Sequence, residues 1–263
     1  MLDPSFETGA PDWVDLGTPD IDAATVFYNG LFGWELQPGG PETGGYGTYQ
    51  LRGRTVAGVM TVPEGQGKPS WSVYFQTPDA GATARTVEQA GGTAAFPPMD
   101  VLDYGRMGGF TDNNGAYFGV WQPGTNPGLG MIMEPGSLIW SELYTPDVPS
   151  AAAFFHTVFG WQTNQMSFPG GSYTVVRPAG TDNDESAFGG LVPLDQVPSE
   201  TAAGPHWLPY FAVDDTDATV SAAERLGGRV TMAATDLAEV GRIATFADPA
   251  GAAFAVIKPA PMP

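Results

Sequence analysis

The chain consists of two copies of one sequence pattern. Residues 12–20 read DWVDLGTPD, and residues 139–147 read IWSELYTPD. An offset of 127 positions relates four landmark pairs: Trp13 and Trp140, Asp20 and Asp147, Phe27 and Phe154, Trp34 and Trp161. Farther along, an offset of 136 positions relates Trp71 to Trp207, Arg106 to Arg242 and Asp112 to Asp248. Solenoid repeats are far shorter, so this is a duplicated domain, and any site that the fold offers should appear twice.

The length and the composition fit two domains, each with its own core. The 263 residues are 42% hydrophobic and only 15% charged, which is typical of a globular chain. Residues 123–130 contain five Gly or Pro residues, as expected of a connector. We therefore expect a first domain at residues 1–122, a linker at 123–138 and a second domain at 139–263.

The charge of the chain limits the partners that it can have. The net charge is −19, which repels the phosphate backbone of nucleic acids and anionic lipid surfaces. No cysteine is present, so disulfides and thiolate chemistry are excluded. The first residues resemble no signal peptide, and no apolar run is long enough to span a membrane. We expect a cytoplasmic protein without nucleic-acid or membrane partners; the sequence leaves a homodimer open.

Each copy divides again into two similar modules. In the first module, residues 13–18 read as a strand and Asp20 as the cap of a helix with Ala24, Phe27, Tyr28 and Leu31 on one face. In the second, residues 71–77 read as a strand and Asp79 as a cap. Three short strand candidates follow each helix, near residues 34–36, 46–51, 56–62, 93–96, 106–111 and 116–122. The pattern predicts strand, helix and three strands, in an α+β fold.

These motifs together resemble a known superfamily. The chain resembles the vicinal oxygen chelate superfamily in three features. These are the signature Trp-x-(Asp/Glu)-Leu-x-Thr-Pro-Asp, the Phe-Gly-Trp segments and the closing turns at residues 112–116 and 248–252. That superfamily contains glyoxalases, bleomycin-resistance proteins and extradiol dioxygenases, and the closest likeness is to its actinobacterial two-domain branch. The resemblance implies two tandem glyoxalase-like domains, each a pair of βαβββ modules that form a curved sheet around a cavity.

The resemblance also identifies where metal ligands would lie, and those positions hold other residues. The first-strand positions are occupied by Trp13, Ser72, Trp140 and Leu208, and the last-strand positions of the second and fourth modules by Gly119 and Ala255. The last strands of the first and third modules offer no His, Asp or Glu. A divalent metal needs several N or O ligands that converge on one point. We therefore expect no metal ion and no other cofactor.

Strand alternation suggests what would face each cavity instead. The candidate ligand-binding residues are Trp13, Asp15, Ser72, Tyr74, Gln76, Tyr117 and Trp121 in the first copy, and Trp140, Glu142, Leu208 and Tyr210 in the second. Such an aromatic lining with one carboxylate suits a small flat aromatic molecule. The residues leave a second interpretation open, in which Trp13 and Trp140 simply fill the former ligand positions as core.

The remaining polar residues are interpreted as structural. His156 corresponds to Asn29, and His206 precedes a strand, so neither reads as a ligand or a general base. Arg106 and Arg242 are expected to hold the turn carboxylates Asp112 and Asp248.

Three functions follow, in order of preference. The first is metal-independent binding of a small aromatic, polyketide-like molecule for sequestration, resistance or biosynthetic support. The second is a cofactor-independent tailoring enzyme, an isomerase, lyase or cyclase, with Asp15 or Glu142 as base and Tyr74 or Tyr210 as donor. The third, a metal-dependent glyoxalase or dioxygenase, lacks its ligands. Nucleophile-elbow, P-loop and dinucleotide motifs are absent.

Overall fold

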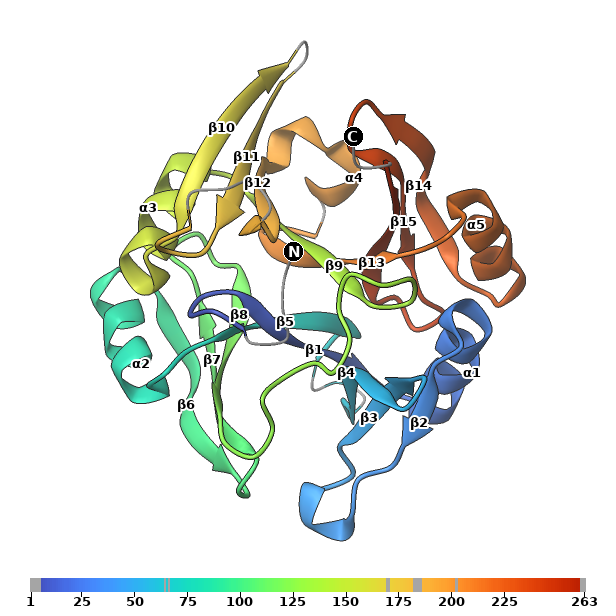
Figure 1. Ribbon diagram of the computed structural model, residues 1–263, viewed down its shortest axis with the longest axis horizontal. Helices are drawn as coiled ribbons and strands as arrows, with labels where there is room; N and C mark the ends of the chain where they lie inside the picture. The colour runs from blue at the N-terminus through green and yellow to red at the C-terminus, as the bar shows by residue number, and fades with distance from the viewer. Residues whose placement is uncertain are drawn as a thin grey trace. The chain divides into compact units, whose positions relative to one another are not determined.

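A computed structural model of the chain has an α+β fold with two eight-stranded mixed sheets, one from each sequence copy (Figure 1). It describes residues 6–63, 65, 67–168, 171–181, 186–201 and 203–260. The fold class predicted from the repeat and its motifs is confirmed. No helix in this described part of the chain is both long and apolar enough to cross a membrane.

The first sheet has the strand order β2-β3-β4-β1-β5-β8-β7-β6. Strand β1 is parallel to β4, and β5 is parallel to β8, whereas the hairpin partners are antiparallel. The elements are β1 (Pro11–Thr18), α1 (Ile21–Phe32), β2 (Glu35–Gln37), the 3-10 helix η1 (Pro41–Thr43), β3 (Gly47–Leu51), β4 (Arg54–Thr61), β5 (Ser70–Gln76), α2 (Ala80–Gln89), β6 (Thr93–Val101), β7 (Gly105–Thr111) and β8 (Tyr117–Pro123).

The second sheet repeats this order as β10-β11-β12-β9-β13-β16-β15-β14. Its elements are β9 (Leu138–Thr145), α3 (Val148–Phe159), β10 (Gln162–Phe168), β11 (Gly171–Arg177), β12 (Gly189–Pro193), the 3-10 helix η3 (Leu194–Gln196), α4 (Pro198–Thr201), β13 (His206–Ala212), α5 (Thr216–Arg225), β14 (Arg229–Leu237), β15 (Gly241–Ala247) and β16 (Ala253–Pro259). Short helices η3 and α4 belong to the stretch where the second copy is longer. The acidic loop expected to hold most of that extra length includes residues 182–185, which lie outside the described residues.

The four longer helices begin at the aspartates that the sequence marks. A side-chain oxygen of each aspartate accepts a hydrogen bond of 2.9 Å from a backbone N–H in the first turn, which satisfies an otherwise unpaired donor. These N-caps are Asp20, Asp79, Asp147 and Asp215. Helices α1 and α3 end at Gly33 and Gly160, both in the left-handed conformation that glycine adopts without strain.

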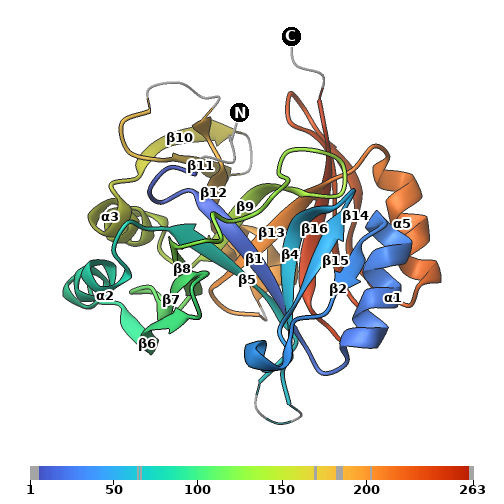
Figure 2. The ribbon, with the colours of Figure 1, turned by 60° about the horizontal axis from the view of Figure 1, so that its bottom comes forward.

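Contacts group the chain into two compact units that do not coincide with the sequence copies. Unit 1 contains Met1–Trp13, Ser72–Gly128 and Ser141–Leu208, and unit 2 contains Val14–Trp71, Leu129–Trp140 and Pro209–Pro263. Helices α2 and α3 pack together in unit 1, and α1 packs with α5 in unit 2 (Figure 2). The sequence domains at residues 1–122 and 139–263, with their linker, stay a prediction.

Each unit has an aromatic core anchored by the tryptophan of a Phe-Gly-Trp segment. Trp34 is fully buried in unit 2, and its Nε1 donates to the carbonyl of Gly136 at 2.7 Å. Trp161 is buried in unit 1, and its Nε1 donates to the carbonyl of Gly9 at 2.8 Å. Gly9 and Gly136 are again 127 positions apart, so the repeat already begins before the strand that first reveals it.

The expectation that Arg106 and Arg242 hold the turn carboxylates is wrong. Each arginine instead lies opposite an acid on the neighbouring edge strand, Asp100 on β6 or Asp236 on β14. The ion-pair distances to these acids are 3.4 Å and 2.9 Å, and Arg242 also pairs with Asp217. The turn aspartates accept hydrogen bonds from backbone N–H groups of their own turns. Cross-strand register therefore places an acid opposite each arginine, and helix α5 supplies a second acid, Asp217, to Arg242.

Candidate functional site

A carboxylate and a tyrosine meet across a glycine in the first repeat. Asp15 on β1 lies directly opposite Gly58 on the parallel strand β4. Tyr46 stands just before β3, whose Thr48 is opposite Gly58 on the antiparallel side. Tyr46 therefore approaches Gly58 on the diagonal, and its hydroxyl donates to Asp15 Oδ2 at 3.3 Å. A Cβ at position 58 would collide with the Tyr46 hydroxyl, so glycine is required for this contact.

The second repeat builds the same arrangement with a longer acid. Glu142 on β9 lies opposite Gly190 on β12, and Val175 on β11 is opposite Gly190 on the other side. The hydroxyl of Tyr173 donates to Glu142 Oε1 at 2.8 Å, and a Cβ at position 190 would collide with that hydroxyl. Tyr144 donates to Glu142 Oε2 at 2.9 Å. Both oxygens of this carboxylate thus accept charge-assisted hydrogen bonds from phenols.

Small residues also face tyrosines in the other two modules. Tyr74 on β5 is in register with Gly119 on β8, and a Cβ at position 119 would run into the Tyr74 ring. Tyr210 on β13 is in register with Ala255 on β16. In each of the four modules, a small residue on the last strand therefore lies beside a tyrosine. The ring at Gly119 occupies the space in which the superfamily resemblance would place a ligating carboxylate.

The sequence reasoning missed three of these tyrosines. Tyr46 and Tyr173 are 127 positions apart, the same offset that relates Asp15 to Glu142, so that offset was the available signal. The offset does not indicate Tyr144, whose counterpart in the first repeat is Gly17. Strand alternation was the available signal, because Tyr144 lies two residues after Glu142 on β9 and therefore on the same face. Periodicity along one strand identified the acids, whereas Tyr46 and Tyr173 come from a neighbouring hairpin whose register the sequence does not specify.

The other predicted ligand-binding residues differ in exposure. Six of them are buried, with 1% to 7% of the residue exposed: Trp13, Asp15, Tyr74, Trp121, Leu208 and Tyr210. The partly exposed members of the predicted set are Ser72, Gln76, Tyr117, Trp140 and Glu142. Trp121 Nε1 donates to the carbonyl of Asn126 at 3.0 Å. Their role in binding a ligand stays a prediction.

Both histidines contact neighbouring groups, and the interpretation that neither is a ligand or a general base stays a prediction. His156 Nδ1 lies 2.9 Å from the carbonyl oxygen of Trp161, and its counterpart Asn29 donates to the carbonyl of Trp34 at 2.8 Å. His156 near the end of α3 and Asn29 near the end of α1 therefore each contact the backbone carbonyl of the tryptophan that follows the helix. His206 stacks on Tyr144, with ring centroids 5.1 Å apart, and its Nε2 lies 3.3 Å from Glu200 Oε2.

The residues at these positions do not fit a divalent metal. Among the residues that the structure describes, no group of three or more His, Cys, Asp or Glu could hold a metal ion. Trp13, Trp140 and Leu208 offer no oxygen or imidazole nitrogen, and Gly119 lies under the Tyr74 ring. We derive no metal-dependent step for this chain.

The purified protein is therefore expected to contain no stoichiometric Zn, Ni, Fe or Mn, and a chelator should leave its melting temperature unchanged. Elemental analysis and thermal melts with and without EDTA test this. A tightly bound metal at one equivalent per chain would contradict it.

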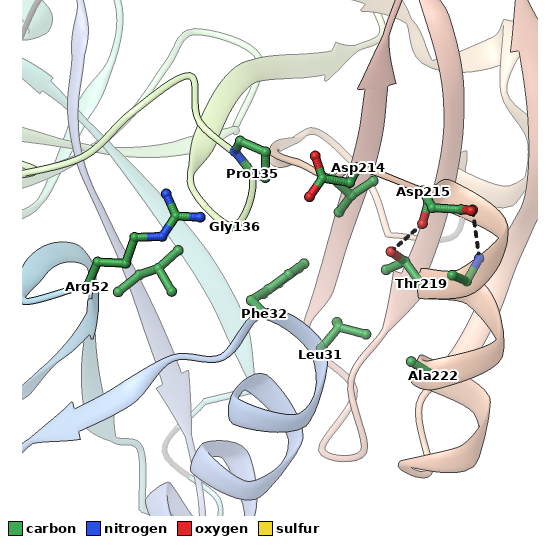
Figure 3. Close-up of a pocket in the computed structure, with 12 residues that line it drawn as sticks. Leu31, Phe32, Arg52, Pro135, Gly136, Asp214, Asp215, Thr219 and Ala222 are labelled. Carbon is green, nitrogen blue, oxygen red and sulfur yellow. Dashed lines mark hydrogen bonds between the residues drawn. The ribbon is translucent and has the colours of Figure 1, made fainter.

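A separate pocket of about 390 Å³ lies in unit 2, beside the C-terminal end of α1 and the N-terminal end of α5 (Figure 3). None of the residues predicted for the site lines it.

Sequence comparison matches two families to the two halves of the chain. Residues 10–120 match the family described as the glyoxalase/bleomycin resistance protein/dioxygenase superfamily, and residues 141–257 match a glyoxalase-like domain. The chain is 39% identical over 264 residues to the Mycobacterium tuberculosis protein CFP32, with 97% of each chain covered. That protein carries the provisional name of a glyoxylase. The chain is also 38% identical over 268 residues to the anthracycline biosynthesis protein DauV of a Streptomyces species, covering 96% of this chain and 94% of that one.

Among solved structures, the chain resembles a 2,3-dioxygenase from a Pseudomonas species with a TM-score of 0.65. The match covers 97% of this chain and 94% of the dioxygenase at 14% identity, which establishes likeness of fold alone.

Proposed function

Because this chain belongs to the glyoxalase/bleomycin resistance protein/dioxygenase superfamily, we propose that it binds a small aromatic, polyketide-like molecule without a metal ion. The binding would serve sequestration, resistance or an accessory step of natural-product biosynthesis. The relationship to DauV, whose name assigns it to anthracycline biosynthesis, supports this class of ligand. The relationship covers nearly the whole chain, both repeats included.

The observation that carries the proposal is the carboxylate–tyrosine pair that occurs in both repeats. Asp15 pairs with Tyr46, and Glu142 pairs with Tyr173, each across a glycine. Gly58 and Gly190 occupy the same place in this geometry, although the number of residues between the acid and the glycine differs between the repeats. A phenol ring offers a flat apolar face, and the carboxylate beside it can accept a hydrogen bond from an amine. An aromatic ligand with an amino group, such as one on an aminosugar, matches both features.

The two repeats should differ in the ligands that they prefer. The first repeat carries Ser72 and Gln76 where the second carries Leu208 and Ala212. An unpaired polar group that becomes buried costs on the order of 1–3 kcal/mol, which is enough to separate two related ligands. Glu142 also differs from Asp15 in length and in the second tyrosine, Tyr144, that holds it.

A cofactor-independent tailoring enzyme is the second candidate. One carboxylate, Asp15 or Glu142, would act as the general base, and Tyr74 or Tyr210 would donate a proton. The hydrogen bonds of Glu142 to two phenols favour this alternative in the second repeat, because they fix the direction of the carboxylate. The provisional glyoxylase name of the mycobacterial relative is compatible with an enzyme as well.

The decisive experiment compares a cationic anthracycline that carries a free aminosugar with its N-acetylated, neutral form. Fluorescence titration measures the affinity of each for wild type, Asp15→Asn and Glu142→Gln. Charge-assisted hydrogen bonds contribute roughly 1.5–3 kcal/mol, so each variant should bind the cationic form about tenfold or more weakly. The affinity for the neutral form should change little.

Asp195→Asn, which removes an exposed acid elsewhere, is the matched control. An unchanged ratio of cationic to neutral affinity in both site variants would refute the pairing of these acids with the ligand. Conversion of either compound, followed by mass spectrometry and lost in a variant that still binds, would favour the enzyme over the binding protein.

A further inference from the structure

The pocket in unit 2 has an apolar floor and opposite charges on its two sides. Phe32 and Leu31 at the end of α1 and Ala222 on α5 form apolar lining (Figure 3). Arg52 lies on one side of the pocket, and Asp214 lies on the other side, above the beginning of α5. Its volume of about 390 Å³ is within the range of small-molecule sites.

The two charged side chains are available to a ligand to different degrees. Arg52 Nη1 lies 3.3 Å from Glu134 Oε2, and Glu134 is also bound by Arg54 at 2.7 Å. One glutamate is thus shared by two arginines, so a local positive charge remains in a strongly acidic protein. Asp214 makes no hydrogen bond or ion pair with the residues that the structure describes. Its neighbour Asp215 is occupied as the N-cap of α5.

The backbone at Arg52 adopts a conformation that glycine or asparagine adopts more readily. Arg52 and Gly53 form the tight turn between β3 and β4, with φ values of 53° and 73°. Asparagine or glycine is favoured at the first position of such a turn, and a bulky side chain with positive φ is strained. Leu102 and Glu239 have positive φ at the turns between β6 and β7 and between β14 and β15, so the strain is shared and the case for Arg52 rests on its place in the pocket.

The charges are also specific to this unit. The position that corresponds to Arg52 in the second repeat is Ala179, and the position that corresponds to Asp214 in the first is Pro78. The duplicated fold therefore does not need either charge, although it keeps the N-cap aspartate in both places, as Asp79 and Asp215.

We propose that this pocket binds a small zwitterion with an apolar body, of the size of a dipeptide. Arg52 binds the carboxylate, Asp214 binds the ammonium group, and the apolar side chains lie on Phe32 and Leu31. The planar guanidinium suits a carboxylate, and the acid across the pocket rejects a ligand without a positive end. This site is independent of the carboxylate–tyrosine pairs.

The test is a calorimetric titration with the dipeptide Leu-Phe, its N-acetyl derivative and its C-terminal amide. Wild type should bind Leu-Phe saturably, and each blocked form should bind about tenfold more weakly. In Asp214→Asn, N-acetylation should cause no further loss, and in Arg52→Gln, amidation should cause none, because each blocked charge has then lost its partner. Arg229→Gln, which removes an exposed arginine outside the pocket, should bind like wild type.

A second variant separates binding from folding. Arg52→Asn relieves the strained turn, so its melting temperature should rise while Leu-Phe binding falls. Loss of binding together with a lower melting temperature would mean that Arg52 is only structural and would overturn the proposal. Absence of saturable Leu-Phe binding to wild type, or equal affinity for all three peptides, would overturn it as well. None of these outcomes depends on binding of an anthracycline, so the two proposals fail separately.

Discussion

Replacing Tyr28 with phenylalanine is expected to destabilise the protein by about 2–4 kcal/mol, whereas Phe155→Tyr, at the corresponding position, should stabilise it by about 1–3 kcal/mol. In unit 2, Trp71 Nε1 donates to the Tyr28 hydroxyl at 3.0 Å, and this hydroxyl donates to Asp248 Oδ2 at 3.1 Å. All three groups are buried. Loss of the hydroxyl would leave a buried donor and a buried acceptor without partners.

In unit 1, the corresponding buried donor and acceptor already lack hydrogen-bond partners among the described residues. Phe155 occupies the position of Tyr28, Trp207 that of Trp71, and Asp112 that of Asp248. Trp207 Nε1 and Asp112 Oδ2 are buried and have no hydrogen-bond partner among the described residues. Burial raises the pKa of the Asp112 carboxyl. The hydrogen bonds from backbone N–H groups of its turn act in the opposite direction and lower the pKa, but the effect of burial is larger.

The geometry of the two clusters indicates that a hydroxyl at position 155 would fit. The rings of Tyr28 and Trp71 have centroids 5.5 Å apart at 84°, and those of Phe155 and Trp207 are 5.7 Å apart at 78°. Each of the two central rings also packs edge-on against its helix neighbour, Phe27 or Phe154, at 5.0 Å. The hydroxyl that Phe155→Tyr introduces should therefore reach both unpaired groups.

Urea denaturation at neutral pH measures both effects as changes in the free energy of unfolding. Tyr49→Phe is the matched control, because its hydroxyl, 3.2 Å from Thr25 Oγ1, bridges no second buried side chain in the described structure. It should cost less than Tyr28→Phe. A destabilised Phe155→Tyr variant would show that unit 1 has no room for the added oxygen, and the proposed equivalence of the two clusters would be wrong.

The sequence was sufficient to predict the fold because repetition and local signals agreed. Asp20 and Asp79 were identified as helix caps from their position before an apolar face, and both cap helices. The positions of the strands followed from alternation and from turn residues. Strand β6, predicted near residues 93–96, continues to Val101. Its pairing with β7 is irregular there, around two prolines that an edge strand tolerates, so periodicity could not show its length.

The site was predicted only in part, for a physical reason. A strand pattern identifies which residues share a face, so Asp15 and Glu142 could be named together with Trp13 and Trp140. Contact between neighbouring strands depends on register, and register placed Tyr46 and Tyr173 over glycines that had no significance in the sequence. The partners of Arg106 and Arg242 were mispredicted for the same reason, because Asp100 and Asp236 lie opposite them across a hairpin. The second partner of Arg242, Asp217, lies on α5.

Asp12 provides the last prediction, in which Asp12→Ile raises the free energy of unfolding at neutral pH by about 1–3 kcal/mol or more. Asp12 lies on β1, is fully buried, and neither of its carboxylate oxygens has a hydrogen-bond partner among residues 6–260 as far as the structure describes them. Burial raises the pKa of this carboxyl well above its ordinary value. The corresponding residue of the second repeat is Ile139, so the same strand position accepts an apolar side chain.

The pH dependence of this effect has a definite sign. Because the pKa is raised in the folded protein, the folded state keeps the proton of Asp12 to higher pH than the unfolded chain does. The stability that this proton provides is fully present below the ordinary pKa of about 3.9 and is lost as the pH rises through the folded value. The advantage of Asp12→Ile over wild type should therefore grow from acid towards neutral pH and then become constant.

Asp12→Asn separates the charge from the unpaired polar atoms, since the amide cannot ionise but still needs hydrogen-bond partners. Its advantage over wild type should follow the same pH curve and almost vanish in acid, where Asp12→Ile should still be more stable. Asp112 and Asp248, whose pKa values burial also raises, are present in every protein compared, so their contribution cancels. Urea denaturation at a series of pH values provides the curves. An advantage that is independent of pH, or an Asp12→Asn protein less stable than wild type at neutral pH, would mean that the Asp12 carboxylate is stabilised as an anion in the folded protein.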